Sequence, residues 1–105
     1  MGPEKLFENR IKTFLKDEGV FYFKTLGSAA TKAGLPDIIC CINGSFVGIE
    51  VKAANGRPSI LQKEIIKQIN ANNGVAVVIY PKDFERLKGL VRALKHNQPL
   101  DTGDL

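Results

Sequence analysis

The segment Phe46 to Ala53, FVGIEVKA, carries a carboxylate and an amine two residues apart. In a β-strand alternate residues face opposite sides of the sheet, so Glu50 and Lys52 share one face with Gly48. The other face is apolar and consists of Val47, Ile49 and Val51. An acid and a base beside a glycine, above an apolar core face, form a candidate catalytic pair.

A second carboxylate, Asp37, begins the preceding predicted strand, Asp37 to Ile42. The Asn43-Gly44 pair between the two strands predicts a tight hairpin turn. With these two residues as the turn, Asp37 falls opposite Glu50, within cross-strand reach. A bulge or a longer loop would shift this pairing by about one residue.

Two carboxylates this close repel each other, and a divalent cation is the natural means of keeping both ionised. Oxygen ligands completed by water favour Mg²⁺ or Mn²⁺ over zinc. Such an ion can polarise a phosphodiester and supply a hydroxide nucleophile, while Lys52 orients the water or stabilises developing charge. A lone Glu-x-Lys is more often an exposed ion pair, so the prediction depends on both strands together.

The rest of the chain predicts the elements that position these residues. The predicted helices are Glu4 to Asp17, Pro58 to Asn72 and Lys82 to Lys95, and the predicted strands are Val20 to Thr25, Asp37 to Ile42, Phe46 to Ala53 and Val75 to Tyr80. This order, α-β-β-β-α-β-α, indicates an α/β (α+β) fold with a mixed central sheet and helices on its faces. The last strand is apolar throughout, so we expect it to be covered on both faces. We expect one domain over residues 1–96 and a loose polar tail over 97–105.

Composition narrows the function classes. The 105 residues carry 15 Lys plus Arg against 11 Asp plus Glu, a net charge of +4 that favours a polyanionic partner. No apolar stretch is long enough for a membrane span or a signal peptide, so we expect a cytoplasmic protein without a membrane partner. Cys40 and Cys41 are predicted to be two reduced, buried thiols. No GxxxxGK[ST] motif is present, so no nucleotide cofactor is expected.

The segment GLPDIICCINGSFVGIEVKAANGRPSILQ resembles the PD-(D/E)XK nuclease superfamily. The residues that match its signature are Pro36, Asp37, Glu50, Val51 and Lys52. More narrowly, the element order, the lead-in Gly34 to Asp37 and the Ser59 to Gln62 step resemble the VRR-NUC family. The resemblance covers about Glu4 to Leu94 and implies a restriction-endonuclease-like core.

This resemblance implies DNA cleavage, and small stand-alone members are similar to Holliday-junction resolvases that act as homodimers. The implied metal ligands are the carboxylates of Asp37 and Glu50 and the backbone carbonyl of Val51, with Lys52 as a catalytic residue. A glutamate on the first helix often completes the site. Glu8 is the best match and Glu4 an alternative, although Glu8 is equally consistent with a solvated helix carboxylate.

Gln62 has two interpretations. The resemblance implies an active-site glutamine near the metal-bound water. The alternative is a capping box in which Ser59 is the N-cap residue and Gln62 is N3. Pro58 fits best at the first helical position, which disfavours the box, so we predict the active-site role.

The loop Leu26 to Leu35 lies just before Asp37, at the mouth of the expected site. Candidate phosphate contacts here and after the third strand are Lys24, Ser28, Thr31, Lys32 and Arg57. The leading hypothesis is a Mg²⁺- or Mn²⁺-dependent endonuclease that cuts branched DNA as a homodimer. The alternatives are a non-cleaving DNA-binding module of the same fold and a restriction- or repair-type nuclease acting on linear or flapped duplex.

Overall fold

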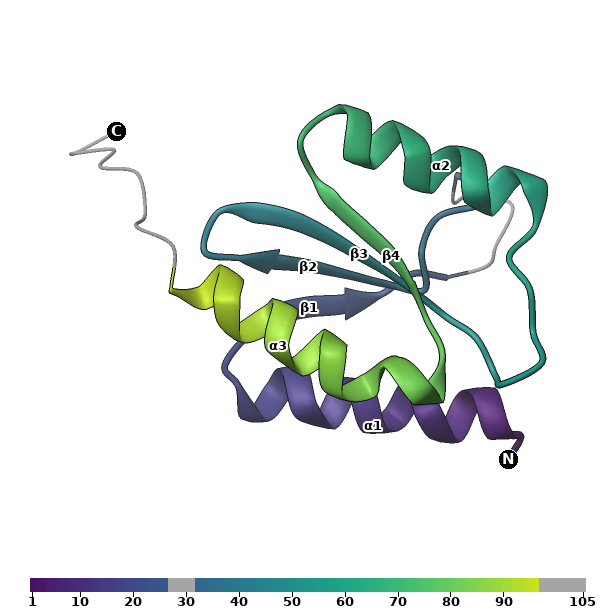
Figure 1. Cartoon of the computed structure of the whole chain (residues 1–105), viewed down its shortest axis with the longest axis horizontal. Coiled ribbons are helices and arrows are strands. Elements are labelled where there is room, and N and C mark those ends of the chain that lie inside the picture. Colours follow the sequence, from purple (N-terminus) through teal and green to yellow (C-terminus); the bar gives the residue numbers. More distant parts are fainter. Residues whose placement is uncertain (27–31, 97–105) are drawn as a thin grey trace.

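The computed structural model describes residues 1–26 and 32–96. Its elements are α1 (Pro3–Asp17), β1 (Phe21–Lys24), β2 (Ile38–Ile42), β3 (Ser45–Val51), α2 (Ile60–Ala71), β4 (Val75–Ile79), the 3₁₀ turn η1 (Pro81–Asp83) and α3 (Phe84–Lys95). This order confirms the predicted α-β-β-β-α-β-α arrangement (Figure 1). The predicted tail, 97–105, lies outside the described residues.

The four strands form one mixed sheet in the order β1-β2-β3-β4. β1 pairs with β2 and β2 with β3 in antiparallel fashion, whereas β3 and β4 are parallel. Asn43 (φ 51°) and Gly44 (φ 86°) both adopt the left-handed conformation that a two-residue hairpin turn requires. The turn fixes the register of the hairpin, in which Ile38 pairs with Ile49.

One face of the sheet forms the main core with α1 and α3, which lie side by side in Figure 1. Phe84 of α3 links the two helices, because its ring makes edge contacts with Phe7 and Phe14 of α1 at centroid distances of 5.8 and 6.1 Å. Burial of these apolar side chains stabilises the fold by roughly 1.5–3 kcal/mol per large residue. The sheet is thereby held on a rigid support.

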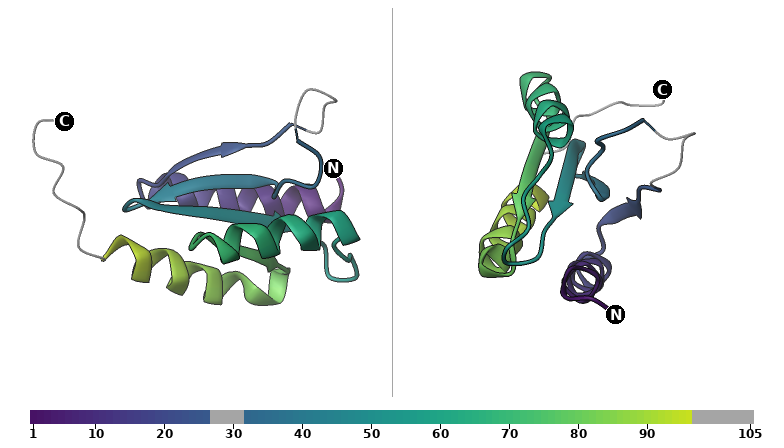
Figure 2. Two further views of the ribbon diagram at one scale, coloured as in Figure 1. Left: turned by 90° about the horizontal axis from the view of Figure 1, so that it is seen from above. Right: turned by 90° about the vertical axis from the view of Figure 1, so that its right-hand side faces the viewer.

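The opposite face is covered only in part, by α2 over β3 and β4. In the right-hand view of Figure 2, α2 and α1 lie at opposite ends with the strands between them. A Cβ added at Gly48 would lie 2.7 Å from Pro36 Cγ and 3.5 Å from Ile69 Cδ1, so only glycine fits between the strand and its cover. Ala76 and Ile79 are buried on opposite faces of β4, which confirms the prediction that this strand is covered on both sides.

The part of this face nearer β1 is exposed. Cys41 lies there, so the prediction that both cysteines are buried is wrong. Cys41 is exposed on the face away from the α1–α3 core, whereas Cys40 is part of that core. Burial raises the pKa of the Cys40 thiol to about 12, so it remains protonated and unreactive.

Two helix starts differ from prediction. α2 begins at Ile60 instead of Pro58, because Ser59 is its N-cap residue. The last helix does not begin at Lys82, since η1 precedes it and α3 starts at Phe84. Within the described residues, every helix is too short or too polar to cross a bilayer.

Candidate active site

The hairpin brings Asp37 and Glu50 together at the ends of two neighbouring strands. Continuing the observed register one residue beyond the Ile38–Ile49 pair places Asp37 opposite Glu50, as predicted. The Asp37 carboxylate accepts a hydrogen bond from the backbone N–H of Val51 at 2.8 Å. Its own backbone carbonyl accepts from the Thr25 N–H at 2.9 Å. Asp37 is therefore held from both flanking strands.

Glu50 is buried because β3 lies between two other strands. It pairs with Val78 of β4, and its residue surface is 1% exposed. Lys52 Nζ lies 2.8 Å from Glu50 Oε2, an ion contact without hydrogen-bond geometry. Neither carboxylate oxygen accepts a hydrogen bond within the described part of the chain. A buried carboxylate in this state is unusual and marks a site that favours a further cation.

The surroundings oppose ionisation of Glu50. Burial raises its pKa to about 7, the nearby Asp37 adds to the rise, and Lys52 lowers it. Partial burial acts to lower the pKa of Lys52, but Glu50 outweighs it and the pKa is raised, so the amine stays charged. A second positive charge at the carboxylates would keep Glu50 ionised at neutral pH.

Glu8 of α1 is also buried but has several cationic partners. The partner ammonium groups are those of Lys24 at 2.7 Å, Lys5 at 2.9 Å and Lys12 at 3.3 Å. Burial acts to raise the pKa of Glu8, but hydrogen bonds from Lys24 and Lys5 outweigh it and lower the pKa to about 2. The carboxylate stays ionised, and its negative charge is compensated by these lysines.

Lys24 connects this cluster to the strand-end pair. Its ammonium contacts Glu8 Oε1 at 2.7 Å and Asp37 Oδ1 at 3.4 Å. The described residues contain no group of three or more His, Cys, Asp or Glu placed to share a metal ion. The expected three-carboxylate arrangement with Glu8 is therefore not formed, because Lys24 stands between Glu8 and Asp37.

The donor set at the strand ends nevertheless fits a divalent cation. Asp37 and Glu50 supply hard carboxylate oxygens, and those of Glu50 are buried and accept no hydrogen bond from the residues that the structure describes. The backbone carbonyl of Val51 lies in the same stretch of chain. Glu4 remains an exposed residue of the first turn of α1.

Gln62 forms the capping box that the sequence disfavoured. The Gln62 N–H donates to Ser59 Oγ at 3.1 Å, and the Ser59 N–H donates to Gln62 Oε1 at 2.8 Å. The premise that Pro58 is the first helical residue is wrong, since Pro58 precedes the N-cap residue. In this structure the Gln62 amide oxygen is engaged at the helix terminus.

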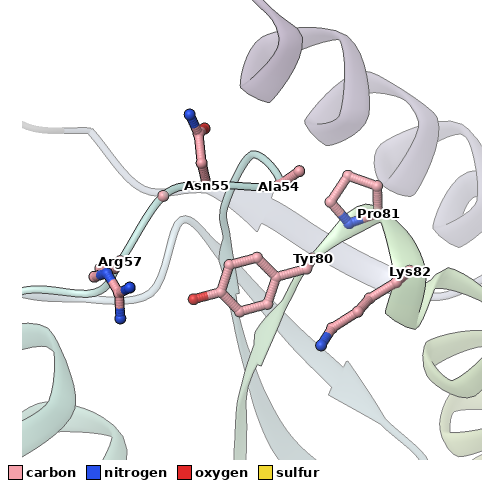
Figure 3. Close-up of a pocket in the computed structure, with 7 residues that line it drawn as sticks. Ala54, Asn55, Arg57, Tyr80, Pro81 and Lys82 are labelled. Atoms are coloured by element: carbon pink, nitrogen blue, oxygen red, sulfur yellow. The ribbon is translucent and has the colours of Figure 1, made fainter.

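The predicted DNA contacts are dispersed. Lys24 is engaged by carboxylates, while Lys32 is exposed beside α2 and lines a groove with its residues. Ser28 and Thr31 lie outside the described residues. Arg57 lines a cavity together with Tyr80 and Lys82 (Figure 3). No role was predicted from the sequence for Tyr80 or Lys82. The parallel pairing of β3 and β4 brings the residues that follow both strands to one edge of the sheet, and this pairing is the feature that could have indicated the cavity.

Comparison with known protein families shows to which family the chain belongs. Residues 4–78, more than half of the chain, match the model of the family described as archaeal Holliday junction resolvase (Hjc). The chain belongs to the Hjc family. This family is part of the PD-(D/E)XK nuclease superfamily, which confirms the broader resemblance, whereas the narrower VRR-NUC assignment stays a prediction. No curated protein and no solved structure matches the chain.

Family membership indicates a resolvase-type endonuclease that acts on DNA. The match includes Asp37, Glu50 and Lys52 and all of α1 except Pro3. It ends before Tyr80 and Lys82, so the cavity in Figure 3 combines matched and unmatched parts of the chain.

Proposed function

We propose that this protein is a divalent-metal-dependent endonuclease that cuts four-way DNA junctions. One observation carries the proposal: within residues 1–26 and 32–96, the buried Glu50 carboxylate has one ion contact, with Lys52, and no hydrogen-bond partner, and it lies beside Asp37 at the strand ends of an Hjc-family fold. The expected ion is Mg²⁺ or Mn²⁺, because both prefer oxygen ligands. When bound, such an ion supplies Lewis-acid polarisation of a phosphodiester.

The protein residues have distinct roles in this proposal. Asp37, Glu50 and the carbonyl of Val51 would hold the ion, with Asp37 oriented by the Val51 N–H. Lys52 keeps its charge and lies at the carboxylate pair, so it can stabilise negative charge developing on the phosphate. Glu8 acts through Lys24, which positions Asp37. Gln62 as a catalytic residue would require the capping box to open.

We also propose that the active form is a homodimer. A junction needs two cuts, and each chain carries one site, which favours a two-fold symmetric pair. Support comes from a set of exposed aromatic rings on the sheet face that the described helices leave uncovered: Phe21 (63% exposed), Phe23 (51%) and Phe46 (48%). Exposed apolar patches of this kind are typical of protein interfaces.

Sedimentation of the wild type and of a Phe21→Ser, Phe46→Ser double variant tests the dimer. We expect a dimer that the double variant converts to monomer, while the control Leu6→Ser, at an equally exposed position on α1, remains dimeric. A monomeric wild type, or equal dissociation in the control, would contradict the proposal.

The nuclease proposal is tested by cleavage of a labelled four-way junction with Mg²⁺, Mn²⁺ or EDTA. We expect cleavage only with metal, and its loss by at least about 10³-fold in Asp37→Asn and Glu50→Gln. Glu85→Gln, a matched change at an exposed glutamate of α3, should keep full activity. Linear and flapped duplexes in the same panel distinguish the repair-type alternative. Tight junction binding without nicking under any metal would favour a non-cleaving module.

A further inference from the structure

A cavity of about 420 Å³ lies at the edge of the sheet where β3 and β4 end. It is lined by residues 54–57, which follow β3, and residues 80–82, which follow β4. These strands are parallel, so their carboxyl ends lie together, and the segments that follow them form the two walls. A cavity of this size falls within the range of small-molecule binding sites.

The cavity adjoins the proposed catalytic lysine. The Lys52 N–H donates to the carbonyl of Ile79 at 3.0 Å, and Ile79 directly precedes Tyr80 in the sequence. On the other wall, a Cβ added at Gly56 would lie 3.4 Å from Lys52 Cδ, so the turn packs against the lysine stem. A group bound in the cavity would therefore lie next to Lys52.

Its chemistry is cationic and aromatic. Figure 3 shows the Tyr80 ring between Arg57 and Lys82, with its hydroxyl end directed toward Arg57. Lys82 Nζ lies 5.9 Å from the Tyr80 ring centroid. In the described ranges 1–26 and 32–96, no carboxylate forms an ion pair with Arg57 or Lys82. Both cations are available to an anionic ligand.

The aromatic wall is preorganised. The Tyr80 N–H donates to the Asp83 carboxylate at 3.1 Å, and the Asp83 N–H donates to the Tyr80 carbonyl at 2.8 Å. Asp83 is therefore engaged in fixing the turn and does not neutralise Lys82. An aromatic ring with flanking cations and no competing carboxylate is suited to a nucleotide, with charge for its phosphate and a ring face for its base.

We propose that this cavity binds one nucleotide of the DNA strand being cut, adjacent to the scissile phosphate. Arg57 and Lys82 hold the phosphate of that nucleotide, and Tyr80 packs against its base. Since a base must leave its stack to reach the ring, the site favours DNA that is distorted near the branch point. This inference rests on the proposed function and assigns a substrate-binding role to Arg57, within the family match, and to Tyr80 and Lys82, beyond it.

Binding is measured first, by fluorescence anisotropy of a labelled four-way junction in EDTA over a range of salt concentrations. We expect Arg57→Ala and Lys82→Ala each to weaken binding about fivefold to twentyfold and to lower the log–log salt slope by about 0.9. The control is Lys16→Ala, which removes the same charge near the far end of α1 and should change neither quantity. Equal losses in the control would overturn the proposal.

Stacking is measured separately, with 2-aminopurine placed at successive positions near the branch point. The wild type and Tyr80→Phe should quench one position, whereas Tyr80→Ala should not and should also raise KM more than it lowers kcat. Thermal melting checks whether Tyr80→Ala is folded. Tyr80→Phe retains the aromatic ring and is the matched variant that should still quench 2-aminopurine.

The two proposals fail in different ways. A wild type that cleaves junctions, with binding and quenching unchanged in Arg57→Ala, Lys82→Ala and Tyr80→Ala, overturns the nucleotide site alone. A wild type that binds through the cavity and does not cleave supports the nucleotide site and overturns the nuclease. Absence of junction binding overturns both.

Discussion

Two buried glutamates on neighbouring elements have opposite electrostatic surroundings. Glu50 on β3 is 1% exposed and Glu8 on α1 is 4% exposed. The pKa of Glu50 is raised to about 7, whereas that of Glu8 is lowered to about 2. Burial opposes ionisation in both, so the difference comes from their partners.

Among the described residues, Glu8 has three lysine ammonium groups within 3.3 Å, and Glu50 has one, with Asp37 beside it. The Glu8 cluster therefore satisfies its charge within the chain, as a structural ion-pair network does. The strand-end site leaves negative charge uncompensated. Burial alone therefore does not identify a metal ligand, whereas a buried carboxylate with too few cationic partners does point to one.

The largest expected effect concerns Lys52, the one cation that contacts Glu50 among the residues that the structure describes. Lys52→Met should lower junction cleavage by about 10²- to 10⁴-fold, because no other described ammonium group contacts Glu50. Mn²⁺ binding should be retained, since the carboxylates remain. Single-turnover rates at saturating metal check the first expectation, and near-normal rates would contradict the role of Lys52.

The metal-free stability of Glu50→Gln should exceed that of the wild type at pH 8. The pKa of Glu50 rises on folding, so its ionisation penalises the folded state, and stability falls as pH increases from about 4.5 through 7. The gain in the variant should reach up to about 3 kcal/mol at pH 8 and vanish below pH 4.5. Urea unfolding in EDTA across this range measures it, and a destabilised variant at pH 8 would contradict the account.

Glu8→Gln should have the opposite effect. The pKa of Glu8 falls on folding, so its charge stabilises the protein above pH 4.5, and this contribution is lost as pH falls toward 2. We expect a loss of about 2 kcal/mol at pH 7, moderated because its lysines are partly exposed. Thermal melts of both proteins at pH 7 and pH 3 give the comparison. A difference that grows at low pH is the result that would reject it.

The smallest effect separates the two interpretations of Gln62. Ser59→Ala and Gln62→Ala each remove part of the capping box and should each cost about 1 kcal/mol. If Gln62 acts only at the helix terminus, both variants keep normal cleavage below their melting temperatures. Loss of cleavage in Gln62→Ala alone would establish the catalytic role that the sequence predicted.

The sequence predicted the pairing of Asp37 with Glu50 because Asn43-Gly44 sets a hairpin register by local rules. It did not predict the surroundings of Glu8, since Lys24 reaches Glu8 only after β1 packs beside α1. The helix start at Ile60 also differs from the sequence prediction, because the Ser59–Gln62 cap hydrogen bonds set it and the preference of proline for the first helical turn does not. Local sequence signals were therefore sufficient to predict the strands. The ion pairs of the buried glutamates depend on tertiary contacts that the sequence does not show.

The central claim is that the strand-end carboxylates hold the catalytic ion and that Glu8 does not. Mn²⁺ affinity at pH 8, measured by electron paramagnetic resonance without DNA, tests it most directly on the wild type, Glu50→Gln and Glu8→Gln. We expect a loss of at least tenfold in Glu50→Gln and a change of less than threefold in Glu8→Gln. An unchanged affinity in Glu50→Gln, or an equal loss in Glu8→Gln, would contradict it.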